Sequence, residues 1–302
     1  MKAKDISGIN LDITNMCTLQ CSGCARTRFR ESFKKYWKNH NIKKEDLFSF
    51  LDINLADTTI QFCGSYGDPI YHEDLISIVQ EFKTQGANIR LHTNGSYRDI
   101  SWWENFTDVL DDKDLVVFSI DGTPENFTTY RKNADWSSIK IGIDAVVRSK
   151  AKSRWDYIIF RYNQYDVEYT EQLSNELGID VFNLKRSERF DDETQWLIPI
   201  DNLGWRYQAQ QDAKEGLQVP VDPRCKNNKQ HYITATGHYL PCCWFDDYRY
   251  LYKTQFGDNQ SQYDIRNTTI SKILALNSVQ EFYNTVEQNS ICQFNCPSCQ
   301  SQ

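Results

Sequence analysis

The stretch Leu11-Asp12-Ile13-Thr14-Asn15-Met16-Cys17-Thr18-Leu19-Gln20-Cys21-Ser22-Gly23-Cys24 decides how the rest of the chain is interpreted. It begins as a short apolar strand that stops at Thr14 and continues as a polar loop. Three cysteines lie on this loop, separated by three and then two residues: Cys17, Cys21 and Cys24. Three thiolates can hold three corners of a cubane iron–sulfur cluster and leave the fourth iron open for chemistry.

This C-x3-C-x2-C loop after a first strand resembles the signature of the radical S-adenosylmethionine (radical SAM) enzymes. The resemblance implies that the methionine part of SAM chelates the open iron, and that one electron from the cluster cleaves SAM to a 5′-deoxyadenosyl radical. The family often has an aromatic residue near the adenine just before the third cysteine, where this chain has Gly23. Zinc is the alternative metal, but it normally takes four protein ligands and this loop offers three.

Composition indicates a folded protein outside the membrane. The chain has 302 residues, of which 40% are hydrophobic and 25% charged, so it is long enough for one large domain and a small one. No apolar run reaches the roughly 18 residues that span a bilayer, and residues 1–5 lack an apolar signal core. We therefore expect a cytoplasmic protein. A net charge of −7 argues against broad binding to nucleic acid.

The ten cysteines fall into two clusters, one near residue 20 and one after residue 224, with Cys63 alone between them. A secreted disulfide framework would spread its cysteines more evenly. Clustered thiols in a cytoplasmic chain indicate metal binding instead.

Apolar strand-like runs alternate with segments of helical character over residues 1–186, which predicts a parallel α/β sheet with right-handed crossovers. The expected strands are Ile9–Thr14, Thr59–Cys63, Ile89–Thr93, Leu115–Ile120, Tyr157–Tyr162 and Val181–Leu184. The expected helices are Arg30–Leu51, His72–Gln85, Ser101–Leu110, Ser137–Ser149 and Glu168–Leu177. Six such units are fewer than the eight of a closed barrel, and the resemblance implies a partial (β/α)6 TIM-like barrel. Reacting groups then gather at the carboxyl ends of the strands.

Motifs at the ends of the second and third strands fit this rule. Phe62-Cys63-Gly64-Ser65-Tyr66-Gly67-Asp68-Pro69 resembles the Gly-Gly-Glu-Pro motif of the family, which implies that Gly67 and Asp68 contact SAM. Glycine lets the backbone approach a ligand, and a carboxylate can accept ammonium protons. A turn that caps the helix near Tyr71 is the alternative, and the position of the motif after the second strand favours SAM binding. Leu91-His92-Thr93-Asn94-Gly95 is similar to a Thr-Asn-Gly segment of the family, so Asn94 joins the SAM site.

The fourth and fifth strands continue the pattern. Phe118-Ser119-Ile120-Asp121-Gly122, followed by Tyr130-Arg131, resembles the branch that modifies peptides and related substrates. The resemblance implies that Ser119 faces the SAM ribose or carboxylate and that Asp121 holds the loop. Arg161 follows on the fifth strand, where its guanidinium either pairs with the methionine carboxylate or makes a surface ion pair.

Several other polar residues lie beside these motifs. His72 and His92 are either proton relays or, more simply, structural histidines. Arg26 and Arg28 follow the third cysteine, where positive charge can tune a reduced cluster or hold SAM, or belong to an exposed loop. Cys63 is best interpreted as a small apolar packing residue.

Residues 187–222 change in character, with more charge and turn formers and a possible helix over Trp205–Gly216. We interpret this segment as a bridge between two domains.

A second cysteine group follows in residues 223–302. Ile233 to Cys243 reads as a hairpin with its turn at Thr236-Gly237, and a helical stretch from Ile270 to about Glu287 precedes the last cysteines. The region resembles the twitch domain, a shortened relative of the SPASM domain, which holds an auxiliary [4Fe–4S] cluster. The ligands that this resemblance implies are Cys225, Cys242, Cys296 and Cys299, with Cys243 and Cys292 in surplus. A structural zinc site with four thiolates is the alternative.

Together these features predict a radical SAM oxidoreductase with SAM, a SAM-binding [4Fe–4S] cluster and an auxiliary [4Fe–4S] cluster. The expected reaction is oxidative modification of a peptide or protein side chain. Dehydrogenation of a small alcohol or sugar-like metabolite is a second enzymatic hypothesis, and a non-catalytic iron–sulfur or zinc scaffold is a third. An external donor such as flavodoxin or ferredoxin is expected to supply electrons.

Overall fold

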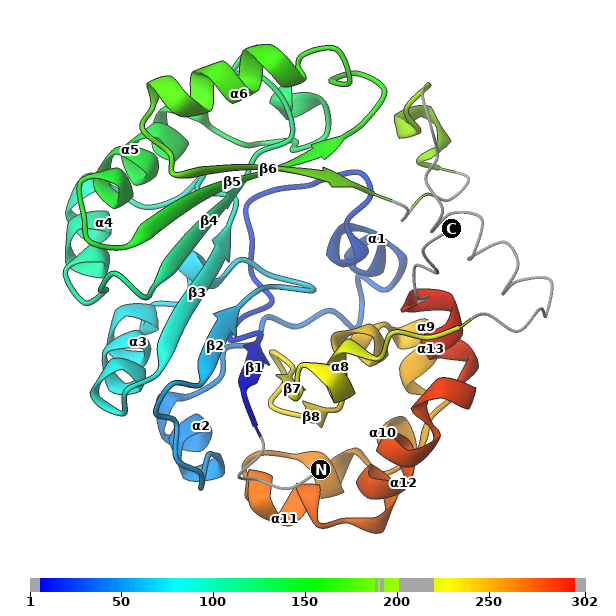
Figure 1. Ribbon diagram of the computed structural model, residues 1–302. Helices are drawn as coiled ribbons and strands as arrows, with labels where there is room; N and C mark the ends of the chain where they lie inside the picture. The colour runs from blue at the N-terminus through cyan, green and yellow to red at the C-terminus, as the bar shows by residue number, and fades with distance from the viewer. Residues whose placement is uncertain (1–5, 188–189, 191–192, 201–219, 297–302) are drawn as a thin grey trace.

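The computed structural model describes residues 6–187, 190, 193–200 and 220–296. Within these residues the chain forms an eight-stranded sheet in the order β6-β5-β4-β3-β2-β1-β7-β8. The sheet curves, helices cover its convex face, and the two edge strands stay apart, so the barrel is open (Figure 1). The fold is the expected partial (β/α)6 TIM-like barrel, extended by two further strands.

Seven of the eight strands run in the same direction, and only β7 and β8 pair antiparallel. The register sets Leu11 beside Phe62 on one side and Ile233 on the other, so neighbouring strands reach the same rim together. The strands are β1 (Gly8–Leu11), β2 (Thr59–Phe62), β3 (Asn88–Thr93), β4 (Leu115–Ser119), β5 (Lys152–Ile159), β6 (Val181–Arg186), β7 (Gln230–Ile233) and β8 (Tyr239–Leu240).

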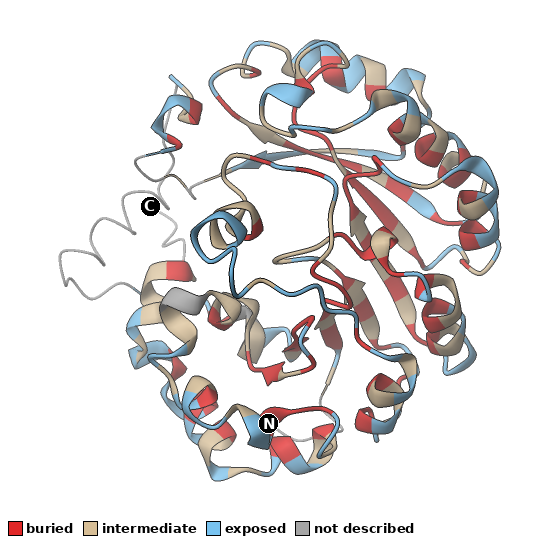
Figure 2. Cartoon of the chain, turned by 180° about the vertical axis from the view of Figure 1, so that it is seen from behind, coloured by how far each residue is buried: buried red, intermediate tan, exposed pale blue. Residues whose placement is uncertain are grey.

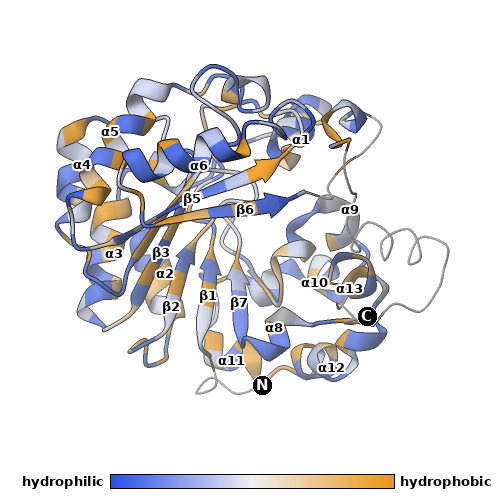
Figure 3. Cartoon of the chain, turned by 45° about the horizontal axis from the view of Figure 1, so that its top comes forward, coloured by the Kyte–Doolittle hydropathy of each residue, from blue (hydrophilic) through white to orange (hydrophobic). Residues whose placement is uncertain are grey.

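Alternation along the strands separates an apolar outer face from a polar inner one. In β3, Ile89 and Leu91 are buried in the core, while Arg90 and His92 lie on the opposite face. Buried residues recur along the strands and on the helix faces turned toward them (Figure 2). The neighbouring strands β5 and β6 differ in hydropathy at their carboxyl ends. β5 ends in apolar residues and β6 in hydrophilic ones (Figure 3). The concave face can therefore take a polar ligand.

The helices of the barrel follow the strands as predicted, with one exception. They are α1 (Ala25–Ser32), α2 (Lys44–Phe50), α3 (Leu75–Thr84), α4 (Ile100–Thr107), α5 (Trp136–Val147) and α6 (Val167–Glu176). In α3 the buried residues recur at helical spacing, namely Leu75, Ile78, Val79 and Phe82. Each such side chain stabilises the fold by roughly 2 kcal/mol when it leaves water. The helix ends at Thr84, and Gly86 follows the C-cap residue with a positive φ of 78°, which a residue with a Cβ rarely adopts.

The exception is the helix predicted over Arg30–Leu51, which is wrong. Two short helices, α1 and α2, take its place, because the segment between them docks on the chain after β1. Ile42 N donates to Ile13 O at 2.8 Å, and the Asn15 side chain binds both Lys38 O and His40 N at 2.8 Å. These tertiary hydrogen bonds replace helical ones.

Several other boundaries differ from the predicted ones. The first strand ends at Leu11 rather than Thr14. The fifth strand starts at Lys152 rather than Tyr157 and ends before Arg161. The helical stretch from Ile270 is divided into α11 (Ile270–Leu274), α12 (Asn277–Thr285) and the 3₁₀ turn η7 (Val286–Gln288). The possible helix over Trp205–Gly216 lies outside the described residues.

The predicted hairpin with its turn at Gly237 is confirmed as β7 and β8, and it does not stand apart from the barrel. β7 pairs with β1 in parallel from Gly8 to Leu11 and so continues the sheet. The C-terminal elements gather beside it, across the opening of the barrel (Figure 1). They are α8 (Arg224–Asn227), η5 (Cys243–Asp246), α9 (Tyr248–Leu251), α10 (Gln255–Asp258), η6 (Gln260–Tyr263) and α13 (Ser290–Asn295), with α11, α12 and η7.

A buried charge network fixes the amino end of the sheet. Asp114 has no exposed surface and precedes β4. Its carboxylate accepts hydrogen bonds from Ile89 N at 2.7 Å and Asp111 N at 2.8 Å, and it pairs with Lys83 Nζ at 2.8 Å. The network ties α3, β3 and β4 together at the end of the barrel opposite the cysteine loop.

Among the described residues, no helix is both long enough and apolar enough to cross a bilayer.

Candidate active site

The cysteine loop begins after the carboxyl end of β1. Arg26, in the first turn of α1 directly after the loop, holds it in place. Arg26 is only 3% exposed, and its guanidinium donates to the carbonyls of Cys17 and of Leu19, the latter at 2.9 Å. Arg28 donates to Gly23 O at 3.3 Å. Both arginines therefore bind loop carbonyls. Because a guanidinium donates in several directions from one plane, Arg26 fixes the curvature of the loop.

The loop after β2 packs directly on the cysteine loop. A Cβ on Gly67 would lie 2.0 Å from Thr14 O, so only glycine allows this approach. Next to it, Asp68 N donates to Met16 O at 2.8 Å. The motif at the end of β2 thus forms a cradle for the residues that lead into Cys17.

Asp68 connects this cradle to the end of β3. Its carboxylate accepts from Thr93 Oγ1 at 2.8 Å, from Asn94 N at 2.7 Å and from the Asn94 side chain, and it also caps the 3₁₀ turn η2 (Pro69–Tyr71) through Ile70 N at 3.2 Å. Burial raises the pKa of Asp68, while the hydrogen bonds from Asn94 and Thr93 lower it in part. Asp68 therefore both caps η2 and orients Asn94.

Asn94 in turn reaches the first cysteine. Its Nδ2 lies 3.5 Å from Cys17 Sγ, and Leu19 N lies 3.4 Å from the same sulfur. Burial raises the pKa of Cys17 and of Cys21 to about 12, so neither thiol ionises readily without a metal. Binding of a metal would have to displace these protons.

Tyr130, which is far from Gly23 in the sequence, fills the space beside it. A Cβ at Gly23 would lie 3.2 Å from Tyr130 Oη and 3.4 Å from its ring. Next to Tyr130, Arg131 pairs at 2.8 Å with Asp121, which is fully buried and also accepts from Ile158 N. Asp121 thus holds its loop, as expected, and the positive charge of Arg131 lowers the pKa of the nearby Cys21 thiol against the effect of burial.

Ser119 and Arg161 are the other two expected SAM-binding residues. Ser119 lies on a strand, and Arg161 lies beyond the end of one. Ser119 is the last residue of β4, partly buried, and lies beside Asp156 of β5. Arg161 lies past the end of β5 and is exposed, and its Nε donates to Ile198 O at 2.9 Å. Among the described residues, the recorded hydrogen bonds of Arg161 do not reach the cysteine loop.

The two histidines near the motifs differ as well. Both ring nitrogens of His72 are hydrogen-bonded to backbone, to Ile42 O at 2.8 Å and to Asp74 N at 3.1 Å, so His72 is structural. His92 lies on the inner face of β3, and its Nε2 is buried without a hydrogen-bond partner among the described residues. Burial lowers the pKa of His92 well below the ordinary value, so its imidazole is neutral near pH 7.

A second group of thiols gathers in the C-terminal region. Burial, and then the charge of Cys296 and of Cys243, raise the pKa of Cys225 to about 12. Cys242 is hydrogen-bonded to Cys243, and Cys292 lies close enough to Cys225 and Cys296 for their charges to raise its pKa. Within the described part of the chain, none of these five cysteines forms a disulfide. Cys299 lies outside the described residues.

The spacing of these thiols bears on the kind of metal they fit. Within the part of the chain that the structure describes, no three Cys, His, Asp or Glu side chains converge on a single metal ion. Zinc needs such convergence, because all its ligands surround one ion. In a cubane each thiolate binds a different iron, so its ligands stand farther apart.

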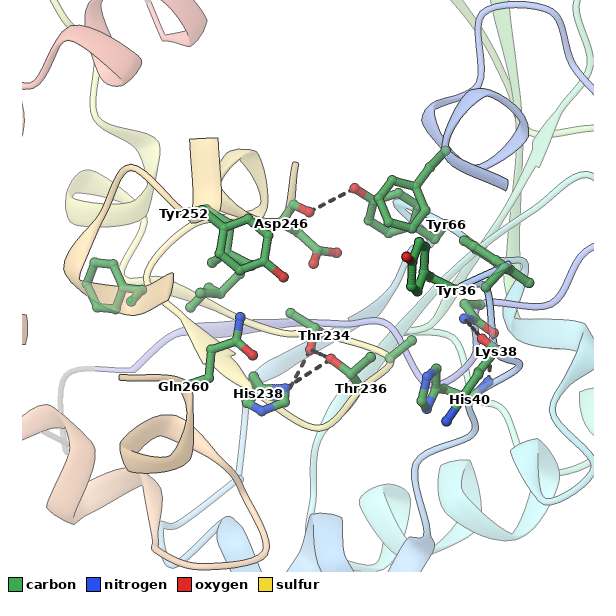
Figure 4. Close-up of a pocket in the computed structure, with 17 residues that line it drawn as sticks. Tyr36, Lys38, His40, Tyr66, Thr234, Thr236, His238, Asp246, Tyr252 and Gln260 are labelled. Atoms are coloured by element: carbon green, nitrogen blue, oxygen red, sulfur yellow. Dashed lines mark hydrogen bonds between the residues drawn. The ribbon is translucent and has the colours of Figure 1, made fainter. Parts of the chain in front are cut away.

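A cavity of about 250 Å³ lies between the segments on either side of the cysteine loop in the sequence, with Tyr66, and the C-terminal region. Its walls come from residues 15–66 and 234–260 (Figure 4). Asn15 lies on one side, two residues before Cys17, and Tyr66 Oη donates across to Asp246 O at 2.8 Å. The aromatic wall comprises Phe29, Tyr36, Trp37, Tyr66, Tyr252 and Phe256.

The sequence analysis missed a pair of carboxyl groups beside this cavity. Tyr232 Oη lies 2.8 Å from Asp12 Oδ2, 2.7 Å from Asp246 Oδ2 and 3.1 Å from Ser65 Oγ. Burial and the charge of Asp246 raise the pKa of Asp12, and burial raises that of Asp246 to about 7. One signal was present in the sequence, because Asp12 follows Asn10 at strand spacing, directly after the end of β1.

Comparison with known proteins adds to this geometry. The family model described as "Radical SAM superfamily" matches residues 11–170. The tungsten-containing aldehyde ferredoxin oxidoreductase cofactor-modifying protein of Pyrococcus furiosus is 28% identical over 118 residues, which cover 38% of this chain and 30% of that protein. This chain therefore matches under a third of that relative.

Two solved structures are similar over most of the chain. Native anSMEcpe with bound AdoMet and Cp18Cys peptide has a TM-score of 0.63 and 14% identity, covering 96% of this chain and 89% of that one. SuiB of Streptococcus suis bound to S-adenosylmethionine has a TM-score of 0.58 and 14% identity, covering 96% and 78%. SuiB has also been solved bound to the precursor peptide SuiA. At these identities the likeness shows the fold.

Proposed function

Because the chain belongs to the radical SAM superfamily, we propose that it uses SAM to oxidise a side chain of a peptide or protein. The observation that carries this proposal is the cysteine loop itself. Three free thiols lie on one loop at the carboxyl end of β1, and Arg26 and the Gly67 cradle fix its path. Thiols held in this way are prepared for a cluster with one open iron.

The residues around the loop suit this assignment. A cubane bound by Cys17, Cys21 and Cys24 would, with SAM, supply a 5′-deoxyadenosyl radical. The chain would bind SAM through the loops that end the strands. We assign Gly67, Asp68, Asn94, Ser119 and Arg161 to that SAM site.

The contacts support different roles for these five residues. Gly67 brings backbone close to the loop, and Asp68 orients Asn94 toward Cys17. Ser119 ends β4 on the rim where reacting groups gather in such barrels. Arg161 would have to release Ile198 O to reach SAM. Its assignment therefore implies a local rearrangement when SAM binds.

The C-terminal thiols support an auxiliary cluster. We assign its ligands to Cys225, Cys242, Cys296 and Cys299, in a twitch- or SPASM-like region over residues 223–302 that residues 187–222 join to the barrel. Such a cluster would take an electron from the substrate radical. A ferredoxin or flavodoxin would supply the electron that cleaves SAM. The net oxidation of the substrate would make the enzyme an oxidoreductase.

The choice of a peptide rests on the neighbours. The structures of anSMEcpe and SuiB were each solved with a peptide bound. The cavity beside Tyr66 and the C-terminal region has aromatic walls and is of a size to admit one side chain or a metabolite of similar size.

The test is a transfer experiment with the reconstituted, reduced enzyme. A pool of peptides deuterated at the α and β carbons of Ser, Cys, Tyr and Lys is incubated with SAM. We expect deuterium in 5′-deoxyadenosine and a peptide product that has lost two hydrogen atoms. A Cys225→Ser and Cys242→Ser double variant should keep the deuterium transfer and lose the oxidised product.

SAM cleavage without deuterium transfer from any peptide would contradict the peptide assignment and favour a small metabolite. A double variant that forms the oxidised product as fast as the natural enzyme would contradict the role of the auxiliary cluster.

A further inference from the structure

A basic segment follows the cysteine loop closely. Residues 30–38 (RESFKKYWK) carry four cations and one acid, whereas the whole chain has a net charge of −7. The four cations are exposed and form what we call the basic patch: Arg30, Lys34, Lys35 and Lys38. Within the part of the chain that the structure describes, no ion pair joins any of these four to a carboxylate. An otherwise acidic molecule therefore presents a local positive surface beside its first cysteine group.

The basic patch is held to the cysteine loop at two points. Cys24 is the N-cap residue of α1, and Arg30 lies in the last turn of that helix, about 9 Å further along its axis at 1.5 Å per residue. At the other end of the patch, the Asn15 side chain donates to Lys38 O at 2.8 Å, two residues before Cys17. α1 lies on the concave side of the sheet, apart from α3, α4 and α5 on the convex face (Figure 1). A protein that docks on the patch would therefore lie close to the thiols of the loop.

Aromatic rings support and surround the basic patch. Phe29 packs on Phe33 and on Trp37, with ring centroids 5.0 and 5.8 Å apart. The Phe29 ring also contacts Tyr66 of the loop after β2, at 6.1 Å. Phe33 and Tyr36 are 37% and 72% exposed. Aromatic side chains are enriched at protein interfaces, and a surface that is already held in place loses less entropy when it binds.

We propose that the basic patch is the docking surface for the acidic protein that supplies the electron to the cysteine loop. This inference rests on the proposed function, which needs a one-electron donor. Flavodoxins and ferredoxins are acidic proteins, so their carboxylates complement the four cations and steer the two proteins together. One electron would leave the reduced donor and reduce the cluster on the loop, with no transfer of atoms. Because electron transfer slows steeply with distance, a patch attached to Cys24 through α1 suits this step.

Charge reversal separates docking from chemistry, because dithionite delivers electrons without a docking surface. The test variant has three changes: Lys34→Glu, Lys35→Glu and Lys38→Glu. The control has the same change in net charge at three exposed lysines on α5 and at the amino end of β5: Lys140→Glu, Lys150→Glu and Lys152→Glu. Both variants should form 5′-deoxyadenosine with dithionite as fast as the natural enzyme.

The donor then reads out the patch. With a flavodoxin that is kept reduced by its NADPH-dependent reductase, the KM for flavodoxin at low salt should rise about tenfold or more in the test variant and stay unchanged in the control. This difference should shrink as salt is added, because salt screens exposed charges. The KM for the peptide pool of the transfer experiment should stay the same in all three proteins.

Cross-linking of the natural protein to flavodoxin with a carbodiimide, read by mass spectrometry, tests the surface without turnover. We expect links from Lys34 or Lys35 to carboxylates of the flavodoxin. An unchanged KM for flavodoxin in the test variant, a raised KM for the peptide pool instead, or cross-links confined to other lysines would each overturn the inference. Failure of the natural enzyme to cleave SAM with dithionite would overturn the proposed function, and the cross-links alone would then decide the docking surface.

Discussion

The loop after β2 can pack closely on the segment that leads into the cysteine loop only because residue 67 is a glycine. Its Cα faces the Thr14 carbonyl so closely that no side chain fits, and the adjacent Asp68 fixes Asn94 beside Cys17. Contacts of this kind form between segments about fifty residues apart in the sequence. A motif in the sequence can identify them, but no local rule gives their distances.

Gly67→Ala should disrupt the cysteine loop, because its Cβ would lie 2.0 Å from Thr14 O. We expect loss of most SAM cleavage and of the iron held by the loop, with a destabilisation of about 1–3 kcal/mol from the forced shift. Gly8→Ala is the control, since its nearest atom is 3.1 Å away on the flexible Gln230 side chain. Iron analysis and thermal unfolding check both, and a Gly67→Ala enzyme with full iron and activity would contradict this account.

Asp246 should make stability depend on pH. Its pKa is about 7 in the folded protein because of burial, whereas an unfolded aspartate titrates near 4. Between these values the folded state keeps a proton that the unfolded state releases, so stability should fall as the pH rises from about 4 to 7 by roughly 1.4 kcal/mol per pH unit at most. Denaturant unfolding at pH 5 and pH 8 measures the fall.

Asp246→Asn should make this fall smaller, so the variant gains stability relative to the natural protein as the pH rises. The buried Asp12 and Asp68, whose pKa values are also raised, keep the rest of the fall. Asp135→Asn should leave it unchanged, because the lowered pKa of Asp135 acts only at more acidic pH. An identical pH dependence in the natural protein and Asp246→Asn would show that Asp246 titrates normally.

At the scale of elements, strand and helix order was predictable and several boundaries were not. Alternation of Ile89 and Leu91 with Arg90 and His92 gives β3 directly. The helix expected over Arg30–Leu51 failed because Asn15 and Ile13 bind the segment between α1 and α2, and local propensity does not register such tertiary hydrogen bonds. The pairing of β7 with β1 was likewise missed, because it joins residues more than two hundred apart.

The buried Asp114 network should serve stability alone, because it lies at the end of the sheet opposite the cysteine loop. Asp114→Ala would leave Ile89 N and Asp111 N without this acceptor, while Lys83 would keep its ion pair with Asp111 at 2.8 Å. We expect a loss of about 1–3 kcal/mol in the free energy of unfolding. Turnover per folded molecule should stay unchanged, as denaturant unfolding and a SAM-cleavage assay would show. Reduced turnover in fully folded protein would contradict this separation of the two ends.

At the scale of the whole molecule, the C-terminal region is part of the barrel sheet. Parallel pairing of β7 with β1 covers an edge that would otherwise present unpaired backbone groups right beside the cysteine loop. The sequence identified both cysteine groups. The pair of carboxyl groups of Asp12 and Asp246, which both contact Tyr232, forms only when the fold brings the end of β1, β7 and η5 together.

A chain that ends at residue 200 should therefore aggregate or fail to hold iron. In such a chain β1 keeps β2 but loses β7, so its other edge is left unpaired. The Cys225→Ser and Cys242→Ser double variant keeps β7 and should retain about four irons per chain, one cubane. Iron and light-scattering measurements compare the two. A truncated chain that stays monomeric with about four irons would show that the barrel stands without the C-terminal region.

The most direct test of the central claim is the formation of 5′-deoxyadenosine from SAM. The natural protein, reconstituted anaerobically with iron and sulfide and reduced with dithionite, should form it, and a variant with Cys17, Cys21 and Cys24 all changed to alanine should form none while keeping its C-terminal iron. No 5′-deoxyadenosine from the iron-loaded natural protein, or equal amounts from the triple variant, would contradict the assignment of the cysteine loop as the site of SAM chemistry.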